Sequence, residues 1–250
     1  MGDESSPTVI QWVIDTRPLW PSAAKTKDLN TVASRALSLL TEKERASVLR
    51  YYHVRDAKLA LASALVKRYA ISRFCGVPWS SAEATRDART KPVFRTSDGD
   101  EPLLFNVSHQ AGLAVLFAVH NPPKGLAGRD GIVFVDMHAE VFGLGEVTAL
   151  KKINPGADVA EREALLASWL RDLEMRGFAP PEDMTGPQEV WFKGEEVKDV
   201  DIKLVSLLGE YMISTAVRRG ENGEGVEVGD FKMLDIEQVL AFGEDATDAL

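Results

Sequence analysis

The side chains best suited to chemistry form a short polar cluster near the middle of the chain. Residues 106–110 read Asn-Val-Ser-His-Gln, and they end an apolar stretch. A second apolar stretch, residues 113–119, follows after Gly112, so the pair predicts a β-hairpin. From a strand end, Ser108 and His109 can hydrogen-bond to a phosphate or a carboxylate. The alternative is an ordinary polar turn, in which Asn and Ser serve only the local geometry.

Two groups of cations precede this cluster. Arg55 and Lys58 stand at the start of a segment whose apolar residues recur every three or four positions, which predicts a long helix. The free N–H groups of a helix N-terminus, together with two cationic side chains, favour an anion there. The second group is Arg86, Arg89 and Lys91, a basic loop closed by a proline, and such side chains grip phosphate. A solvated helix face and a solubilising loop are the alternatives.

Helices and strands of both halves must position these residues. In the first half we predict a strand over residues 8–14, a helix over 28–40, a second helix opened by a capping box at 41–44, and the long helix over 56–75. In the second half we predict a helix over 158–177, strands over 189–192, 201–207 and 211–217, and a short helix over 236–242. The acidic end of the chain, from Gly243, is expected to fray.

Composition narrows the class of protein. The 250 residues suffice for one large domain or two smaller ones, and 45% hydrophobic with 27% charged residues is typical of a globular protein. A formal charge of −9 argues against a general nucleic-acid binder. The single cysteine, Cys75, excludes an internal disulfide and a cysteine-based zinc site, and it favours a reducing, cytoplasmic location. We expect no signal peptide, no membrane span and no membrane partner.

The order and spacing of these motifs resemble the Sfp-type 4′-phosphopantetheinyl transferases, in particular the branch with fungal and lysine-pathway members. The resemblance rests on Arg-Asp-Ala-Lys at 55–58, Lys-Pro at 91–92 and the polar cluster at 106–110. Residues 163–170 and 211–217 also resemble fungal members. One departure is Thr90, where the family usually has a glycine before Lys-Pro, because a Cβ there hinders a close backbone approach.

This resemblance implies an α+β fold of two pseudo-symmetric halves, residues 1–125 and 126–250, each a small antiparallel sheet packed on a long helix. It implies transfer of phosphopantetheine from coenzyme A to a serine of an apo acyl or peptidyl carrier protein, with Mg²⁺, in lysine biosynthesis or secondary metabolism. The enzyme would be a monomer. The residues implied to hold the phosphates and nucleotide of coenzyme A are Arg55, Arg86, Lys91, Ser108 and His109.

The second half departs from the family's pattern. Family members carry a metal-binding Asp in a strand soon after the hairpin; Asp130 is its counterpart here, although a plain Asp-Gly turn is the alternative, and a helix over 134–153 follows. Their next motif, Trp-x-x-Lys-Glu-x-x-x-Lys, is absent, and Glu163 is the nearest counterpart of its catalytic glutamate. Two segments are therefore missing, through splicing, a misread gene or degeneration.

Three hypotheses remain at this stage. The first is an active, Mg²⁺-dependent 4′-phosphopantetheinyl transferase. The second is an impaired homologue or splice product that binds coenzyme A or the carrier protein without transfer. In the third, the missing segments expose apolar surface and the chain aggregates.

Overall fold

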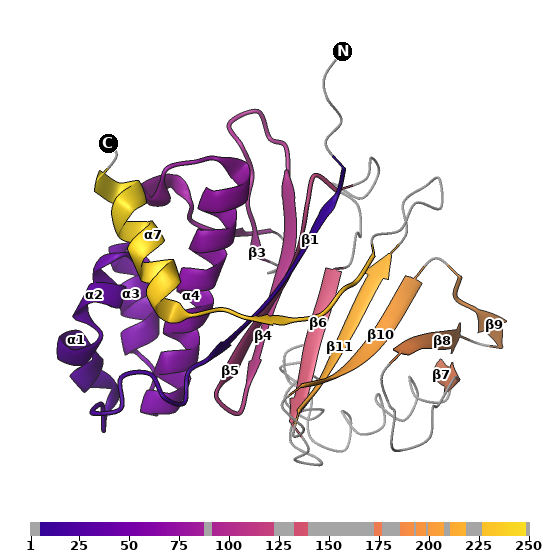
Figure 1. Cartoon of the computed structure of the whole chain (residues 1–250), viewed down its shortest axis with the longest axis horizontal. Coiled ribbons are helices and arrows are strands. Elements are labelled where there is room, and N and C mark those ends of the chain that lie inside the picture. Colours follow the sequence, from indigo (N-terminus) through magenta and orange to yellow (C-terminus); the bar gives the residue numbers. More distant parts are fainter. Residues whose placement is uncertain are drawn as a thin grey trace.

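The chain folds into two main β-sheets and a layer of helices in the computed structural model shown in Figure 1. The structure describes residues 6–87, 92–122, 133–139, 173–176, 186–192, 194–198, 200–207, 211–218 and 227–248. The first sheet contains, in this order, β12 (Lys232–Met233), β1 (Thr8–Asp15), β5 (Leu113–His120) and β4 (Leu103–Gln110). The second contains β6 (Val133–Ala139), β11 (Tyr211–Arg218), β10 (Val200–Leu207), β8 (Gly186–Phe192) and β7 (Leu173–Arg176), with β9 (Glu195–Glu196) beside β8. A small third sheet pairs β2 (Thr85–Arg86) with β3 (Pro92–Val93).

The helical layer covers the first sheet, so the predicted α+β class is confirmed. Its members are η1 (Thr26–Asp28), α1 (Leu29–Val32), α2 (Ser34–Ser38), α3 (Glu42–Leu49), α4 (Val54–Cys75), η2 (Trp79–Ser81) and α7 (Ile236–Asp248). The helix predicted over residues 28–40 is broken at Ala33, which lies between α1 and α2 with non-helical ψ. No helix in the described ranges is long and apolar enough to cross a lipid bilayer.

β1 lies in the middle of the molecule, where the helices cover one of its faces and the second sheet covers the other. Its side chains at Ile10 and Ile14 pack under the helices, whereas Val13 packs against the second sheet. Along its whole length β1 pairs with the antiparallel strand β5. The predicted first strand is confirmed, and apolar residues on both faces are typical of a strand buried between two layers.

β4 and β5 form the predicted hairpin, in which Gln110 pairs with Leu113. The two turn residues, Ala111 and Gly112, have φ angles of 47° and 91°. Positive φ at both positions matches the twist of the flanking strands, and it costs glycine least. A Cβ added to Gly112 would overlap the side chain of Arg17, so the close packing also requires glycine here.

α4 is the central helix, and it ends at Gly76, a left-handed cap with φ of 64°. Arg68, only 1% exposed, ties α4 to its neighbours: Nε donates to the Glu44 carboxylate at 2.8 Å, and Nη1 donates to the backbone oxygen of Trp79 at 2.7 Å. Glu44 also accepts from the backbone N–H of Thr41 at 3.1 Å, which completes the predicted capping box. One carboxylate therefore caps α3 and neutralises a buried guanidinium of α4.

The second sheet packs on the face of the first sheet that the helices leave free. Ile213 and Val217 of β11 lie in one buried cluster with Val13, Val115 and Phe117. β6, at the edge of the second sheet, lies beside β4, at the edge of the first (Figure 1). The two sheets therefore meet along a seam between β4 and β6.

In the second half, three predicted strands are confirmed and two predicted helices are wrong where the structure describes them. The confirmed strands are β8, β10 and β11. Residues 133–139, expected to begin a helix over 134–153, form β6 and pair with β11. Residues 173–176, expected to end a helix over 158–177, form β7 and pair with β8. For residues 173–176, pairing with β8 outweighs the local helical pattern, whereas the helix over 134–153 was implied only by the family resemblance. The rest of both predicted helices lies outside the described residues.

The last described residues return to the first half of the chain. β12 pairs in parallel with β1, and the backbone N–H of Leu234 donates to the Val13 oxygen at 2.8 Å. α7 then packs on α4, where the Phe242 ring meets Tyr69 edge-on with 5.0 Å between centroids (Figure 1). The division into residues 1–125 and 126–250 stays a prediction.

The expectation that the chain frays from Gly243 is wrong, because α7 continues to Asp248. A Cβ on Gly243 would lie 3.0 Å from Leu39 and 3.1 Å from the Trp79 ring, so this residue is tightly packed. Arg35 on α2 adds a bidentate pair to Glu244, with N–O distances of 2.6 and 2.8 Å. Packing and charge together hold the end of the chain in place.

Candidate functional site

The N-terminus of α4 lies at the same end of the first sheet as the hairpin turn. Phe74, near the other end of α4, packs against His120 with 5.6 Å between ring centroids and the rings tilted by 50°, and His120 pairs with Thr8 at the start of β1. β1 then runs to Asp15, which pairs with Leu113 beside the turn. With a rise of 1.5 Å per residue, the first turn of α4 lies about 30 Å from Phe74. It lies toward the end of β1 that carries Asp15 (Figure 1).

Ser108 and His109 lie in the last part of β4, just before the turn. His109 is exposed and Ser108 is half-buried. Asn106 turns back on its own backbone, because its Oδ1 accepts the N–H of Val107 at 3.0 Å. Arg55, Ser108 and His109 therefore lie toward the same end of the first sheet, and their sharing of one anion site stays a prediction.

A cleft of about 920 Å³ opens at the N-terminus of α4, between residues 24–27 and residues 50–55. Neither segment contains a carboxylate. The basic side chains that line it are Lys25, Lys27, Arg50, His53 and Arg55. Arg55 is 81% exposed, and its nearest carboxylate, Asp56, is 3.6 Å away. Five basic side chains beside the free N–H groups of a helix N-terminus suit an anion that carries several charges.

Two tyrosines stand at the rim of this cleft. Tyr52 is 92% exposed, and its ring meets His53 edge-on with 4.9 Å between centroids. An exposed aromatic ring among cations is a platform on which a nucleobase stacks. Of the residues that line this cleft, the sequence analysis named only Arg55 as a candidate for the anion site. The basic segments are visible in the sequence, but residues 24–27 and 50–55 become neighbours only through the fold.

Arg86, in β2, lies beside a part of α4 that is further from the N-terminus of this helix than Arg55 is. Burial of Lys67 lowers the pKa of its ammonium group; Glu44 opposes this shift, and the positive charges of Arg86 and Arg68 reinforce it. Lys67 is about 18 Å along the helix from Arg55. The structure thus places Arg86 beside the middle of α4, and Arg86 is not among the described residues that line the cleft.

We expect the variant Lys67→Met to unfold at a higher temperature than the wild type at neutral pH. The folded-state pKa of Lys67 is lowered, so its charge destabilises the fold at low and neutral pH. The penalty fades as the pH rises through the lowered pKa toward the ordinary value of 10.5. Thermal denaturation from pH 7 to 10 measures the difference, which must shrink as the pH rises. A constant or growing difference would contradict this assignment.

Asp136 is a candidate that sequence reasoning missed. It lies in the middle of β6, paired in register with Ser214 of β11, and β6 lies beside the hairpin strand β4. The signal was the apolar alternation of Val133, Val135 and Met137, which predicts a strand with Asp136 on its other face. The helix prediction for this region obscured it.

Three predicted site residues, Lys91, Asp130 and Glu163, lie outside the described residues. Their roles stay predictions. In the ranges that the structure describes, no three His, Cys, Asp or Glu side chains gather where they could hold a metal ion.

The α+β fold thus carries a basic cleft at the N-terminus of α4, at the end of the first sheet where the hairpin of Ser108 and His109 turns, and the Asp28 carboxylate accepts hydrogen bonds from the backbone of Ala24 and Lys25 at its edge. The family described as 4′-phosphopantetheinyl transferase, N-terminal, matches residues 27–121. Over 98% of both chains, the protein is 60% identical to 4′-phosphopantetheinyl transferase 1 of Fusarium mangiferae. The chain belongs to the 4′-phosphopantetheinyl transferase family, as the sequence motifs predicted.

More distant relatives extend this similarity. The chain is 27% identical to the 4′-phosphopantetheinyl transferase NpgA of Emericella nidulans, over 94% of this chain and 93% of NpgA. It is 26% identical to the L-aminoadipate-semialdehyde dehydrogenase-phosphopantetheinyl transferase of Schizosaccharomyces pombe, over 70% of this chain and 57% of that protein. The branch with fungal and lysine-pathway members is therefore confirmed.

The alignment with the Fusarium protein also shows a difference in length. It spans 286 positions against the 250 residues of this chain, so at least 36 positions have no residue here. That relative therefore carries segments without a counterpart in this chain. Where they fall, and whether they include the helix motif, stays a prediction.

Proposed function

We propose that this protein transfers 4′-phosphopantetheine from coenzyme A to a serine of an acyl or peptidyl carrier protein. One observation carries the proposal: the basic cleft at the N-terminus of α4 opens at the end of the sheet where Ser108 and His109 lie. The nucleotide phosphates of coenzyme A are the anions that suit this cleft, and an adenine stacks on Tyr52. Arg86 and Lys91 are proposed to extend the phosphate site along α4.

The proposed reaction is a phosphoryl-type substitution. The serine oxygen of the carrier protein forms a bond to the β-phosphorus of coenzyme A, and the bond from that phosphorus to the bridging oxygen breaks. The leaving group is 3′,5′-ADP, which takes the electron pair of the broken bond. The serine proton passes to a carboxylate, for which Glu163 is proposed. Cations around the diphosphate stabilise the charge that gathers in the transition state.

Mg²⁺ is the proposed metal, and the carboxylates proposed to hold it are Asp136 and Asp130. Mg²⁺ commonly binds through one or two carboxylates, several waters and substrate phosphates, so a single strand carboxylate at the seam beside β4 fits its needs. When bound, it would neutralise charge on the diphosphate. The residues of the cleft would still bind and orient the nucleotide without it.

Carrier proteins are the proposed partners, with the protein acting as a cytoplasmic monomer. The name of the Schizosaccharomyces relative points to L-aminoadipate-semialdehyde dehydrogenase, so a carrier domain of that kind is a proposed substrate, as are carriers of secondary metabolism. The alternative, binding without transfer, is not favoured, because the relatives that cover most of this chain are named as transferases.

The decisive experiment incubates the protein with coenzyme A, Mg²⁺ and an apo carrier protein. Mass spectrometry must show the carrier gaining one phosphopantetheine arm, and a carrier with its serine changed to alanine must stay unmodified. If no mass is gained while calorimetry shows coenzyme A binding, the binding-only alternative holds instead. If neither is seen with a cooperatively folded sample, the proposed function is wrong.

The variant Arg55→Ala is expected to raise the KM for coenzyme A about tenfold while kcat changes less than about twofold. Arg55 is placed to hold the bound nucleotide, and its high exposure keeps the loss near the lower end for a charge-assisted hydrogen bond. Steady-state kinetics with varied coenzyme A measures the change. The matched control is Arg73→Ala, an exposed arginine near the opposite end of the same helix, which must leave KM unchanged.

A further inference from the structure

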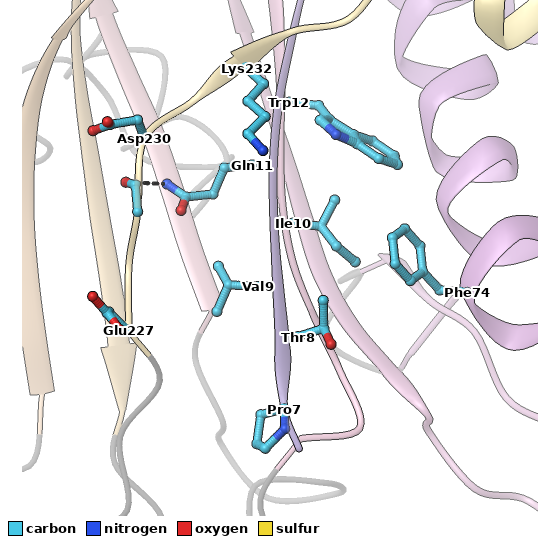
Figure 2. A pocket seen from close by; sticks show the side chains of 11 residues that line it. Pro7, Thr8, Val9, Ile10, Gln11, Trp12, Phe74, Glu227, Asp230 and Lys232 are labelled. Carbon is cyan, nitrogen blue, oxygen red and sulfur yellow. Dashed lines mark hydrogen bonds between the residues drawn. The ribbon is translucent and has the colours of Figure 1, made fainter. Parts of the chain in front are cut away.

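The two ends of β1 are held in different ways. At its start, β1 lines a cavity of about 750 Å³, which the side chain of Gln11 crosses to donate to the Gly229 oxygen at 3.1 Å (Figure 2). At its other end, the chain continues into Thr16 and Arg17, which contact the hairpin turn between β4 and β5. This second end lies beside the strand end that carries His109.

Thr16 holds the backbone of the turn. Its N–H and its side-chain hydroxyl both donate to the Gly112 oxygen, each at 2.7 Å, and Thr16 is only 2% exposed. The bond from the N–H continues the pairing of β1 with β5 one residue beyond Asp15↔Leu113. The bond from the hydroxyl belongs to the side chain, so a substitution can remove it alone. A carbonyl oxygen has two lone pairs, and two donors fix its direction.

Arg17 covers the same glycine with its side chain. Its guanidinium pairs with Asp15, with 2.9 Å from Nε to Oδ1 and 2.7 Å from Nη2 to Oδ2. The aliphatic stem of Arg17 lies where a Cβ on Gly112 would be. The hydrogen bonds from Arg17 lower the pKa of the Asp15 carboxyl, so the pair is formed at neutral pH. The ion pair therefore holds this stem against the turn.

The turn needs such support because its own residues match its shape poorly. Ala111 and Gly112 both have positive φ. Two-residue hairpin turns of this kind favour Asn-Gly or Asp-Gly, and a positive φ is strained for alanine. Such a turn specifies the register of its two strands only weakly. A slip of one residue would move every side chain to the other face of the sheet.

The register decides on which face His109 lies. His109 pairs with Ala114, which pairs in turn with Ile14. Directly opposite residues share a face of a sheet, and both Ala114 and Ile14 are buried under the helices. His109 therefore lies on the face on which α4 packs, and its side chain is exposed there. A slip would place Ser108 or Gln110 on this face instead.

We propose that Thr16 and Arg17 are positioning residues of the transfer reaction. They hold the turn at Ala111 and Gly112, and thereby keep His109 on the face of the sheet that carries α4. This inference rests on the proposed function, in which His109 contacts a phosphate of coenzyme A. In this role neither Thr16 nor Arg17 touches the ligand.

The test measures the Kd of coenzyme A by calorimetry, which requires no transfer, for Thr16→Val in the full-length protein. Valine keeps the branched shape and the backbone bond but removes the hydroxyl. The Kd is expected to rise about fivefold, the usual effect of losing one neutral hydrogen bond. In steady-state kinetics, KM for coenzyme A rises with it, whereas KM for the carrier protein stays within about twofold. Thr16→Ser keeps the hydroxyl and is expected to restore wild-type binding.

A double-mutant cycle separates positioning from a general structural role. In the His109→Ala background, Thr16→Val is expected to change the Kd less than about twofold, because the residue that it positions is gone. Two controls lose a comparable bond elsewhere. Gln11→Met removes the bond at the other end of β1, and Thr247→Val removes a hydroxyl that donates to the Gly243 oxygen at 2.6 Å. Both controls must bind coenzyme A like the wild type.

Arg17→Ala repeats the cycle at a side chain that is 44% exposed, so the proposal is decided even where Thr16→Val does not fold. An unchanged Kd in these variants, a loss of full size without His109, or an equal loss in the controls overturns the proposal. A full loss in Arg17→Ala without His109 would mean that Arg17 contacts the ligand itself. A wild type that binds coenzyme A without transfer contradicts the proposed function, while the cycle still decides this inference. A wild type that does not bind coenzyme A contradicts both.

Discussion

Truncating the chain after Asp230 is expected to abolish the cooperative unfolding transition of the whole protein. The truncation removes β12 and α7, and with them Leu234, Ile236, Val239 and Leu240, which are buried in the main core. Burying one such side chain contributes about 1.5–3 kcal/mol, so the loss is comparable with the whole stability of a typical domain, about 5–15 kcal/mol. Without these residues, apolar side chains of the main core in the first half are exposed to solvent.

Thermal denaturation followed by circular dichroism measures this effect. The expected result is a low soluble yield, or a soluble product that binds a hydrophobic dye and melts without cooperativity. The control separates packing from charge: Arg35→Ala in the full-length chain removes the pairs to Glu237 and Glu244 but must keep a cooperative transition. A truncated protein that melts cooperatively near the wild-type temperature would show that residues 231–250 are dispensable.

The variant Asp136→Asn is expected to lower the rate of phosphopantetheine transfer about 100-fold or more. Removing a metal-binding carboxylate forfeits several kcal/mol of transition-state charge stabilisation, and each 1.4 kcal/mol corresponds to about tenfold in rate. Asparagine keeps the size of the side chain, so the pairing of β6 with β11 is expected to survive. Coenzyme A binding without Mg²⁺ should change less than about threefold.

Single-turnover transfer at varied Mg²⁺ concentrations measures the loss, and two further variants make it specific. Asp201→Asn, on β10 in the same sheet but two strands away, is the matched control and should remain active. Asp130→Asn tests the residue that the motif spacing favoured. If Asp130→Asn is inactive and Asp136→Asn is active, the metal site belongs to Asp130, and the assignment to β6 is wrong.

Much of the first half could be predicted from local patterns. The capping box of Thr41 and Glu44, the long helix ending at Gly76, and the hairpin around Gly112 each depend on residues close in sequence. Local interactions such as caps and left-handed turn positions act over a few residues, so one stretch of chain contains all the information they need. The family's phosphate-binding motifs belong to this same half, and together with residues 163–170 and 211–217 they allowed the family to be named from the sequence.

Local patterns did not predict all of the secondary structure of the second half correctly. Residues 173–176 carry a pattern that local propensity assigns to a helix, yet they form a strand because β8 provides a hydrogen-bonding partner. Residues 133–139, which the family resemblance assigned to a helix, pair with β11. A strand gains most of its stability from neighbours that lie far away in the sequence, and those neighbours are not visible in a local window. Asp136 was overlooked as a site residue because the family resemblance assigned residues 134–153 to a helix.

The sequence alone determined that this is an α+β protein of the 4′-phosphopantetheinyl transferase family, and it predicted an anion site near Arg55 and His109. Tertiary structure decided three further points: that Lys25 and Lys27 join Arg50 and Arg55 in one cleft, that β6 lies beside β4, and that α7 closes the core of the first half. Each of these contacts joins segments far apart in the chain. Closing such loops costs entropy that only the complete core repays, so no single segment specifies them.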